Sequence, residues 1–394
     1  MKRFLALLLL FALLFACAGC SLFDRTVYEV TEYSAETEEA TNDSVGYISD
    51  YAALRRAIVW LVAEHQESAE LQFQNYDGNI SRDLSQACWE VKSSTPLGAF
   101  AVDYTSFDLS RIVSFYQADV YITYKRSVEQ MEELEQLGGL SAFQRRLNTA
   151  LSAGERYLVL QMTAASLTPE AVADYIRKAY YADALASPVL PHAEVSLYPD
   201  SGVERIVEIT LDYGKTDEEL AAMRQALTEA CETAAQTIAA DSASGEVSGE
   251  PDSSAADRLY AAAQYLSARC VFAPEGGCTA HDALVSGSAD SEGMAMAFQA
   301  LCGTLGLDCQ TVSGRLDNEE HFWAIVSFGG QSYHIDPTAP AEHFLAGDDE
   351  MWGRYWWDTA IYPACPADYN YFGQSEAPAS AEPEEMPDGI AHSA

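Results

Sequence analysis

The apolar residues between 287 and 306 recur with the period of an α-helix. One stripe of that helix would be buried, formed by Met294, Ala297, Phe298, Leu301 and Leu305. A Gly/Ser turn precedes the stripe, and Asp290 or Ser291 within it is a natural N-cap. Gly306 can end the helix in the left-handed conformation. The pattern therefore predicts a core helix whose first turn is polar.

Two alternating segments after this helix predict a β-hairpin. EEHFWAIVSF and QSYHIDPT are separated by Gly329-Gly330, a pair that suits a two-residue turn. Such a turn pairs Phe328 with Gln331 and fixes the register of both strands. The sequence therefore predicts adjacent antiparallel strands beside the helix.

The predicted register brings two titratable side chains together. It places His321 opposite Thr338 and Asp336 opposite Trp323, so His321 and Asp336 share one face as diagonal neighbours. Diagonal neighbours lie about 7–8 Å apart at the backbone, within reach of an imidazole–carboxylate hydrogen bond. With Ser291 at the helix N-terminus, these residues have the composition of a nucleophilic triad.

The region upstream carries a repeat of helix, strand, helix and one or two strands. Leu54 and Phe143, Leu71 and Leu160, and Tyr124 and Tyr213 are each 89 positions apart. The spacing predicts two tandem α+β units, followed by a closing helix from Asp217 to Ala239. No catalytic set gathers in these units, which favours binding or spacing as their role.

The N-terminus has the pattern of a secretory signal. Lys2 and Arg3 precede an apolar run from Phe4 to Ala16 that is too short for a stable membrane span. Ala18-Gly19-Cys20 resembles the lipobox of bacterial lipoproteins, which implies a lipid on Cys20. Cys17 is a second candidate, and simple cleavage with secretion is the alternative. The expected location is the extracellular face of a bacterial cell membrane.

Composition shifts divide the chain into segments. Acidic, Ser-rich or Pro-rich stretches read as tether, linker and tail. The predicted order is signal 1–20, tether 21–45, repeat units 46–135 and 136–239, linker 240–257, a C-terminal domain 258–372 and an acidic tail 373–394.

The charge and cysteine content exclude several classes of partner and site. A formal charge of -38 repels nucleic acid and anionic lipid headgroups, so neither is expected as a partner. The seven cysteines outside the signal show no CxxC pair, and no His-rich spacing indicates a metal. Their odd number argues against a disulfide framework, although a single pair such as Cys270 with Cys278 stays open. No cofactor is expected.

The C-terminal domain resembles the bacterial transglutaminase-like superfamily, which has a papain-like fold. HDALVSG, EGMAMAFQALCGTLGLDC, VSG, HFWAIV and YHIDPT carry this resemblance over about 110 residues. The resemblance implies an α+β domain in which a helix packs on an antiparallel sheet. It also implies a Cys–His–Asp triad, whose positions here are Ser291, His321 and Asp336.

The nucleophile position departs from that family, because Ser291 stands where the family has Cys. A serine hydroxyl must lose its proton during attack, whereas a thiol is readily ionised beforehand. Asp290 and Glu292 also add negative charge where an oxyanion would form. We therefore expect a catalytically degenerate domain that binds peptide or cell-wall fragments in a cleft with Trp323, and with Trp356 or Trp357.

Two other functions stay open at this stage. One is an active acyl-transfer enzyme, a protease or amidase, that uses a Ser291–His321–Asp336 triad. The other is a transporter's solute-binding lipoprotein, which would need two lobes with parallel sheets. The strand pattern reads as antiparallel, which disfavours a solute-binding protein.

Overall fold

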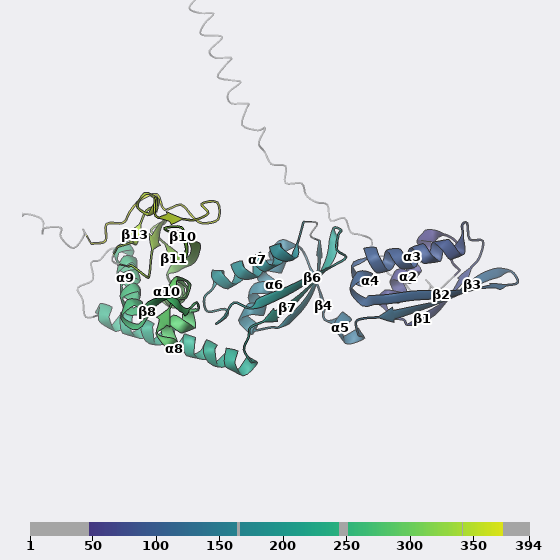
Figure 1. Ribbon diagram of the computed structural model, residues 1–394, viewed down its shortest axis with the longest axis horizontal. Helices are drawn as coiled ribbons and strands as arrows, with labels where there is room; N and C mark the ends of the chain where they lie inside the picture. The colour runs from purple at the N-terminus through teal and green to yellow at the C-terminus, as the bar shows by residue number, and fades with distance from the viewer. Residues whose placement is uncertain (1–46, 164–165, 244–250, 341, 373–394) are drawn as a thin grey trace, which may run out of the picture. The chain divides into compact units, whose positions relative to one another are not determined.

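The computed structural model describes residues 47–163, 166–243, 251–340 and 342–372 (Figure 1). The predicted signal, Cys20, the tether and the acidic tail lie outside these residues. Helices and strands are mixed along the chain, which confirms the α+β class. No helix in the described part is long and apolar enough to cross a membrane. The chain divides into two compact units, one with residues up to Ala87 and Ser106–Tyr121, the other with Cys88–Thr105 and Ile122 onward.

The N-terminal α+β segment is built on a three-stranded sheet in the order β1-β3-β2. Its elements are α2 (Tyr51–Ala63), β1 (Ser68–Phe73), α3 (Ile80–Ser94), α4 (Pro96–Ala101), β2 (Val102–Ile112) and β3 (Phe115–Tyr124). Leu71 and Phe73 on β1 are buried, as are Ala118 and Val120 on β3. Because alternate positions are buried, one face of the sheet forms the core of this segment.

The next segment is a four-stranded sheet in the order β4-β5-β7-β6, in which only β4 runs parallel to its neighbour. Its elements are α5 (Val128–Glu132), β4 (Leu134–Leu137), α6 (Leu140–Ala153), β5 (Tyr157–Thr163), α7 (Pro169–Ala182), β6 (His192–Tyr198), β7 (Glu204–Asp212) and α8 (Asp217–Ala243). Leu71 pairs with Ala118 between β1 and β3, and Leu160 pairs with Val207 between β5 and β7. Both members of these pairs differ by the same 89 positions.

The C-terminal region contains a five-stranded antiparallel sheet in the order β13-β12-β11-β10-β14. Its elements are α9 (Pro251–Arg269), β8 (Val271–Gly277), the π-helix η3 (Asp282–Ser286), β9 (Ser288–Ala289), α10 (Ser291–Thr304), β10 (Asp308–Leu316), β11 (Glu319–Phe328), β12 (Gln331–Ile335), β13 (Phe344–Ala346), α11 (Asp348–Met351) and β14 (Tyr355–Trp356). The predicted hairpin is confirmed. Phe328 pairs with Gln331, and Gly329 and Gly330 have φ values of 59° and 77°, which suit a type I′ turn.

Helix α10 is buried more completely than one stripe. Every residue from Gly293 to Cys302 is buried, because α8, α9, η3 and the strands β10 and β11 all contact it. Gly293 lies so close to β8 and β9 that an added Cβ would be 2.6 Å from the Gly277 carbonyl oxygen. The expectation of a single apolar stripe was wrong, because neighbours cover the helix on all sides.

Helices extend into both ends of the predicted linker 240–257. Helix α8 runs to Ala243 and α9 begins at Pro251, so only residues 244–250 between them lie outside the described part. One hydrophobic cluster runs from Phe143 to Leu345 and includes residues of α6, α8, α9, α10 and the C-terminal sheet. The second α+β segment and the C-terminal region therefore share a core.

Candidate functional site

Ser291 is the first residue of α10, and it is held there by its neighbour. The Asp290 side chain caps the helix by accepting a hydrogen bond from the Gly293 N–H at 2.9 Å. Ser291 is 9% exposed, and its Oγ accepts a hydrogen bond from the Phe322 N–H at 3.3 Å. The main chain of β11 therefore lies directly against the serine hydroxyl.

His321 and Asp336 form a buried pair. His321 Nε2 and Asp336 Oδ2 are 2.8 Å apart, although the β11–β12 pairing ends at Ala324 and Ile335. Asp336 Oδ2 also accepts from the Tyr355 hydroxyl at 2.7 Å. Its Oδ1 accepts from the Thr338 N–H at 2.9 Å and from the Thr338 hydroxyl at 2.7 Å. Both carboxylate oxygens are thus fully used.

The hydrogen bonds at Asp336 favour its ionised form. Burial opposes ionisation, but the hydrogen bond and charge of His321, together with bonds from Tyr355 and Thr338, hold the pKa of Asp336 below its ordinary value of 3.8. A carboxylate that orients an imidazole through one nitrogen has the role of the third member of a triad. The structure therefore holds the His321 ring against an ionised, fully hydrogen-bonded carboxylate.

Ser291 is not joined to the His321–Asp336 pair. In the described part of the chain, no hydrogen bond links Ser291 with the His321 ring, whose Nδ1 has no hydrogen-bond partner there. Ser291 Oγ accepts from the Phe322 N–H, and its own proton has no acceptor among the described residues. A serine nucleophile needs its proton aimed at the base, and the structure does not show that arrangement.

Trp323 does not line a cleft. It is fully buried, its ring stacks on His321 with centroids 6.3 Å apart, and its Nε1–H donates to His334 Nδ1 at 3.0 Å. Trp357 is buried as well, whereas Trp356 is 59% exposed. Of the three tryptophans considered for a cleft, only Trp356 is exposed to solvent.

One trio in the described residues has the composition of a metal site. His334, Asp348 and Cys365 have ligand atoms that all lie within 4.8 Å of one another. However, Trp323 donates to His334 Nδ1, so neutral His334 carries its proton on Nε2 and donates it to Asp348 Oδ1 at 3.0 Å. A metal on Nε2 would displace that proton and leave an anionic ring. The trio fits a buried hydrogen-bond chain that fixes Trp323 beneath His321.

The second α+β segment contributes a residue to the site that sequence reasoning missed. Tyr181, at the end of α7, donates its hydroxyl to Glu292 Oε1 at 2.7 Å. Its ring packs against Phe322 with centroids 5.7 Å apart, and its carbonyl accepts from Gln299 Nε2 at 3.0 Å. The contact joins residues more than 100 positions apart, and no local pattern in the sequence indicates it.

Glu292 is a hydrogen-bond partner of Tyr181 as well as a negative charge at the helix start. Burial raises the pKa of Glu292, the Tyr181 hydroxyl lowers it, and the charges of Asp290 and Glu320 raise it, with a net pKa of about 7. Cys278 lies in the same electrostatic environment. Desolvation and the charges of Glu292, Asp290 and Asp282 raise the pKa of its thiol to about 11, so Cys278 is no substitute for a catalytic thiolate.

The raised pKa of Glu292 predicts a pH-dependent cost in stability. The unfolded chain loses this proton near pH 4.5 and the folded chain near pH 7, so stability falls as pH rises between these values and stays lower above them. Glu292→Gln should therefore be more stable than wild type by about 1–2 kcal/mol at pH 8 and nearly equal to it at pH 4.5. Urea unfolding at both pH values measures this, with exposed Glu218→Gln as control. An identical difference at the two pH values would contradict the prediction.

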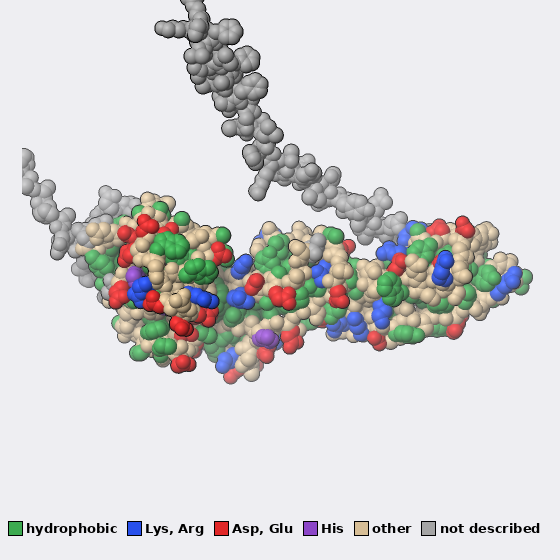
Figure 2. Space-filling model, turned by 45° about the horizontal axis from the view of Figure 1, so that its top comes forward, with side chains coloured by type: hydrophobic (Ala, Val, Ile, Leu, Met, Phe, Trp, Pro, Cys, Tyr) green, Lys and Arg blue, Asp and Glu red, His purple; other side chains and the backbone are tan. Residues whose placement is uncertain are grey.

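A pocket of about 400 Å³ opens at the ends of β10 and β11 beside this site. It is lined by Ser313, Gly314, Arg315, Asn318, Glu320 and Trp356. Gly314 pairs with His321 across the strands, and Glu320 is one of the charges that act on Asp290 and Glu292. On the face shown in Figure 2, acidic side chains spread over the C-terminal region with hydrophobic side chains between them. The pocket is therefore linked to the site through the His321–Gly314 strand pair and the charge of Glu320.

Comparison with known proteins gives partial likenesses. No family model and no curated protein matches the sequence. The chain is similar to the crystal structure of a TGase, with a TM-score of 0.25 and 13% identity over 58% of this chain and 62% of that one. It is also similar to a candidate cysteine protease from Cytophaga hutchinsonii, with a TM-score of 0.24 and 10% identity over 44% of this chain and 69% of that one. The chain thus spans less than two thirds of the TGase's length. TM-scores of this size carry no argument of their own.

Proposed function

We propose that the C-terminal region is a transglutaminase-like domain that binds peptide or cell-wall fragments without turning them over. The observation that carries this proposal is the hydrogen bonding at Ser291. Its hydroxyl accepts from the Phe322 N–H and has no hydrogen bond to His321, while the His321–Asp336 pair is complete. An imidazole and a carboxylate are hydrogen-bonded to each other, whereas the serine hydroxyl is a weak nucleophile with no hydrogen bond to that imidazole.

The pocket beside the site supports a binding role. Trp356 is 59% exposed and offers a flat apolar surface, on which a sugar ring or an apolar side chain can pack. Arg315, Glu320 and Asn318 supply polar groups of both charges at its edge. A few polar groups around an aromatic surface are typical of sites that orient a ligand.

Trp356→Ala is expected to weaken binding of soluble peptidoglycan fragments or their stem peptides by about tenfold or more, because the stacking surface is lost. Calorimetric titration of the full-length protein measures the affinity. Trp352→Ala is the matched control, since Trp352 is 50% exposed but stacks on Trp357 and does not line the pocket. Equal losses in both variants would contradict a site at Trp356.

The alternative is an active acyl-transfer enzyme, and the complete His321–Asp336 pair is the observation that favours it. This alternative predicts that a fluorophosphonate labels wild-type Ser291 and that His321→Ala abolishes the labelling. The binding proposal predicts no labelling in either protein.

We further propose that the protein is held on the extracellular face of a bacterial membrane by a lipid on Cys20. The Ala18-Gly19-Cys20 sequence after an apolar run supports this. Metabolic labelling with a lipid precursor is expected to tag wild type and not Cys20→Ala. Equal labelling of both would move the anchor to Cys17, and no labelling would indicate a secreted protein.

We also propose that 46–135 and 136–239 are tandem copies of one α+β unit that spaces or presents the C-terminal domain. The equal offset of Leu71–Ala118 and Leu160–Val207 supports this, as does the equivalent sheet order β1-β3-β2 and β5-β7-β6. An experimental structure in which the two units do not superpose would contradict it.

A further inference from the structure

In the second α+β segment, a buried arginine fills the space between the strand ends and the loop after β5. Arg205 on β7 is 5% exposed, and its guanidinium donates to three carbonyl oxygens. The acceptors are Leu167 at 2.7 Å, Pro199 at 3.0 Å and Asp200 at 2.7 Å. This side chain closes that end of the segment.

The corresponding place in the first segment is open. Arg205 pairs with Met162 across the strands, and the residues 89 positions earlier, Tyr116 and Phe73, pair in the same way. Tyr116 and Phe73 line a pocket of about 280 Å³ together with the loop after β1. Where the second segment has a guanidinium bonded to carbonyls, the first has a cavity.

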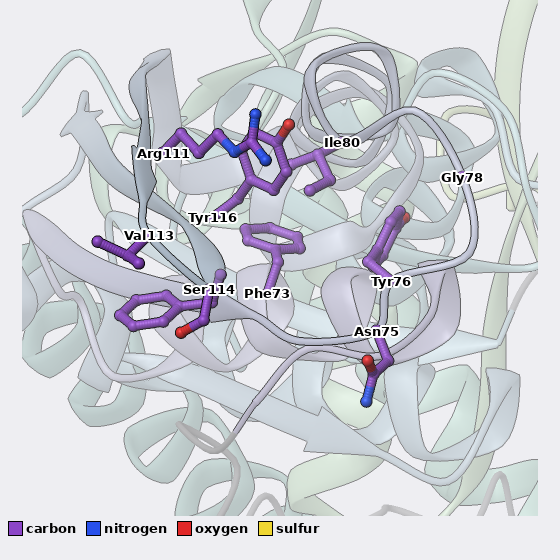
Figure 3. Close-up of a pocket in the computed structure, with 10 residues that line it drawn as sticks. Phe73, Asn75, Tyr76, Gly78, Ile80, Arg111, Val113, Ser114 and Tyr116 are labelled. Atoms are coloured by element: carbon purple, nitrogen blue, oxygen red, sulfur yellow. The ribbon is translucent and has the colours of Figure 1, made fainter.

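Aromatic side chains form most of the walls of this pocket. The ring of Phe73 is buried and meets the ring of Tyr76 edge-on at 5.3 Å, while Tyr116 is 39% exposed. Figure 3 shows the rings of Tyr116, Phe73 and Tyr76 across the pocket, with Asn75 at one side. Gly78 in the loop has φ of 151°, and an added Cβ there would be 2.6 Å from Asp83 Oδ2. The loop can take this path only with glycine.

The pocket carries one positive charge without an internal acceptor. The Arg111 guanidinium lies over the Tyr116 ring, 5.9 Å from its centroid (Figure 3), and it makes no hydrogen bond or ion pair with the described residues. The nearby Asp83 carboxylate is already occupied by the Tyr76 hydroxyl and by Arg82. On a chain with a formal charge of -38, such a guanidinium is a local site for an anion.

The turn beside Arg111 is strained. Val113 has φ of 26° and is 97% exposed, although a β-branched residue strongly disfavours this conformation. Strained exposed turns often occur at binding sites. The turn joins the strand that carries Arg111 to the strand that carries Tyr116, and both residues line the pocket.

We propose that this pocket binds a carboxylate attached to an apolar or aromatic group, as in the C-terminal residue of a peptide. Arg111 would take the carboxylate through charge-assisted hydrogen bonds, and Tyr116, Phe73 and Tyr76 would surround the apolar group. The volume admits one side chain of this size. The site lies outside the C-terminal domain and does not depend on its proposed function.

Calorimetric titration of the full-length protein with N-acetylphenylalanine tests the proposal. We expect binding that weakens by about tenfold or more in Arg111→Met and in Tyr116→Ala. Arg177→Met, which changes an exposed guanidinium on α7, should bind like wild type. N-acetylphenylalanine amide, which lacks the carboxylate, should also bind about tenfold more weakly than the acid.

Two further probes refine the test. One distinguishes a free organic acid from a peptide terminus, and the other asks whether the pocket prefers a cation to an anion. Equal binding of 3-phenylpropionate would assign the site to free organic acids, and weaker binding would assign it to a peptide terminus. The proposal is overturned if no probe binds, if the amide binds as well as the acid, or if Arg111→Met has no effect. It is also overturned if N-acetylarginine amide binds best. The pocket would then hold a guanidinium from a ligand, as the corresponding place in the second segment holds that of Arg205. Thermal melts of each variant confirm that it is folded.

Discussion

Ser291→Cys is expected to convert an unreactive position into one that a thiol probe labels at pH 6. An ordinary thiol is less than about 1% ionised at that pH, whereas a thiol beside an imidazole at a helix N-terminus has a pKa of about 6 or below. Labelling should therefore be about 100-fold faster than in Ser291→Cys/His321→Ala. The opposing charge of Glu292 is largely removed at pH 6, because its pKa is about 7.

The background for this test must be free of competing thiols. Cys278 is exposed, Cys309 is half-buried and Cys302 is buried in the same helix as Ser291, so all three are replaced, and mass spectrometry locates the label. Wild type in the same background should react with neither a thiol probe nor a fluorophosphonate. A Ser291→Cys thiol as inert as a buried one would show that the site is closed to ligands and would leave the domain a structural role.

Asp336→Ala should cost about 3–5 kcal/mol in the free energy of unfolding at pH 7, because it leaves His321, Tyr355 and Thr338 without their shared buried acceptor. Four hydrogen bonds of 2.7 to 2.9 Å are lost. Urea unfolding followed by circular dichroism measures the change. Asp317→Ala is the control, since Asp317 forms an exposed ion pair with Arg354 and should cost less than about 1 kcal/mol.

The loss should depend on pH in one direction. The folded-state pKa of Asp336 lies below its ordinary value of 3.8, so its contribution is present above that value and is lost as pH falls through the folded-state pKa. The difference between wild type and Asp336→Ala should narrow below about pH 4. A difference that stays constant down to pH 2 would show that shape, and not the ionised carboxylate, stabilises the fold here.

The sequence predicts the parts of the site that follow local rules. Gly329-Gly330 selects a two-residue turn, and that turn alone sets the register from Phe328 to Ile335. The capping residue Asp290 and the left-handed Gly306 follow from similar short-range chemistry. The strand pairing stops one residue before Asp336, but the register still brings its carboxylate to His321.

Other parts of the site depend on packing between segments that are distant in the sequence. The hydrophobic periodicity of a single segment carries no information about such packing. The position of α10 among α8, α9 and the sheet buries all its faces, so a stripe read from one helix underestimates its burial. Trp323 was expected to line a cleft because it is aromatic. It is buried in the core instead, where its indole N–H donates to His334. The sequence shows Glu292 only as a negative charge at the helix start, and its hydrogen bond from Tyr181 depends on a segment more than 100 positions away.

The contact of Tyr181 with Glu292 and Phe322 should keep the second α+β segment and the C-terminal region together during evolution. A fragment beginning at residue 258 would leave Phe322 uncovered, Glu292 without its hydroxyl donor and Gln299 without one carbonyl acceptor. Recombination that cut between these segments would therefore yield a poorly packed product. The second α+β segment and the C-terminal region should accordingly be exchanged between genomes as one block, and substitutions at Tyr181 and Glu292 should occur together.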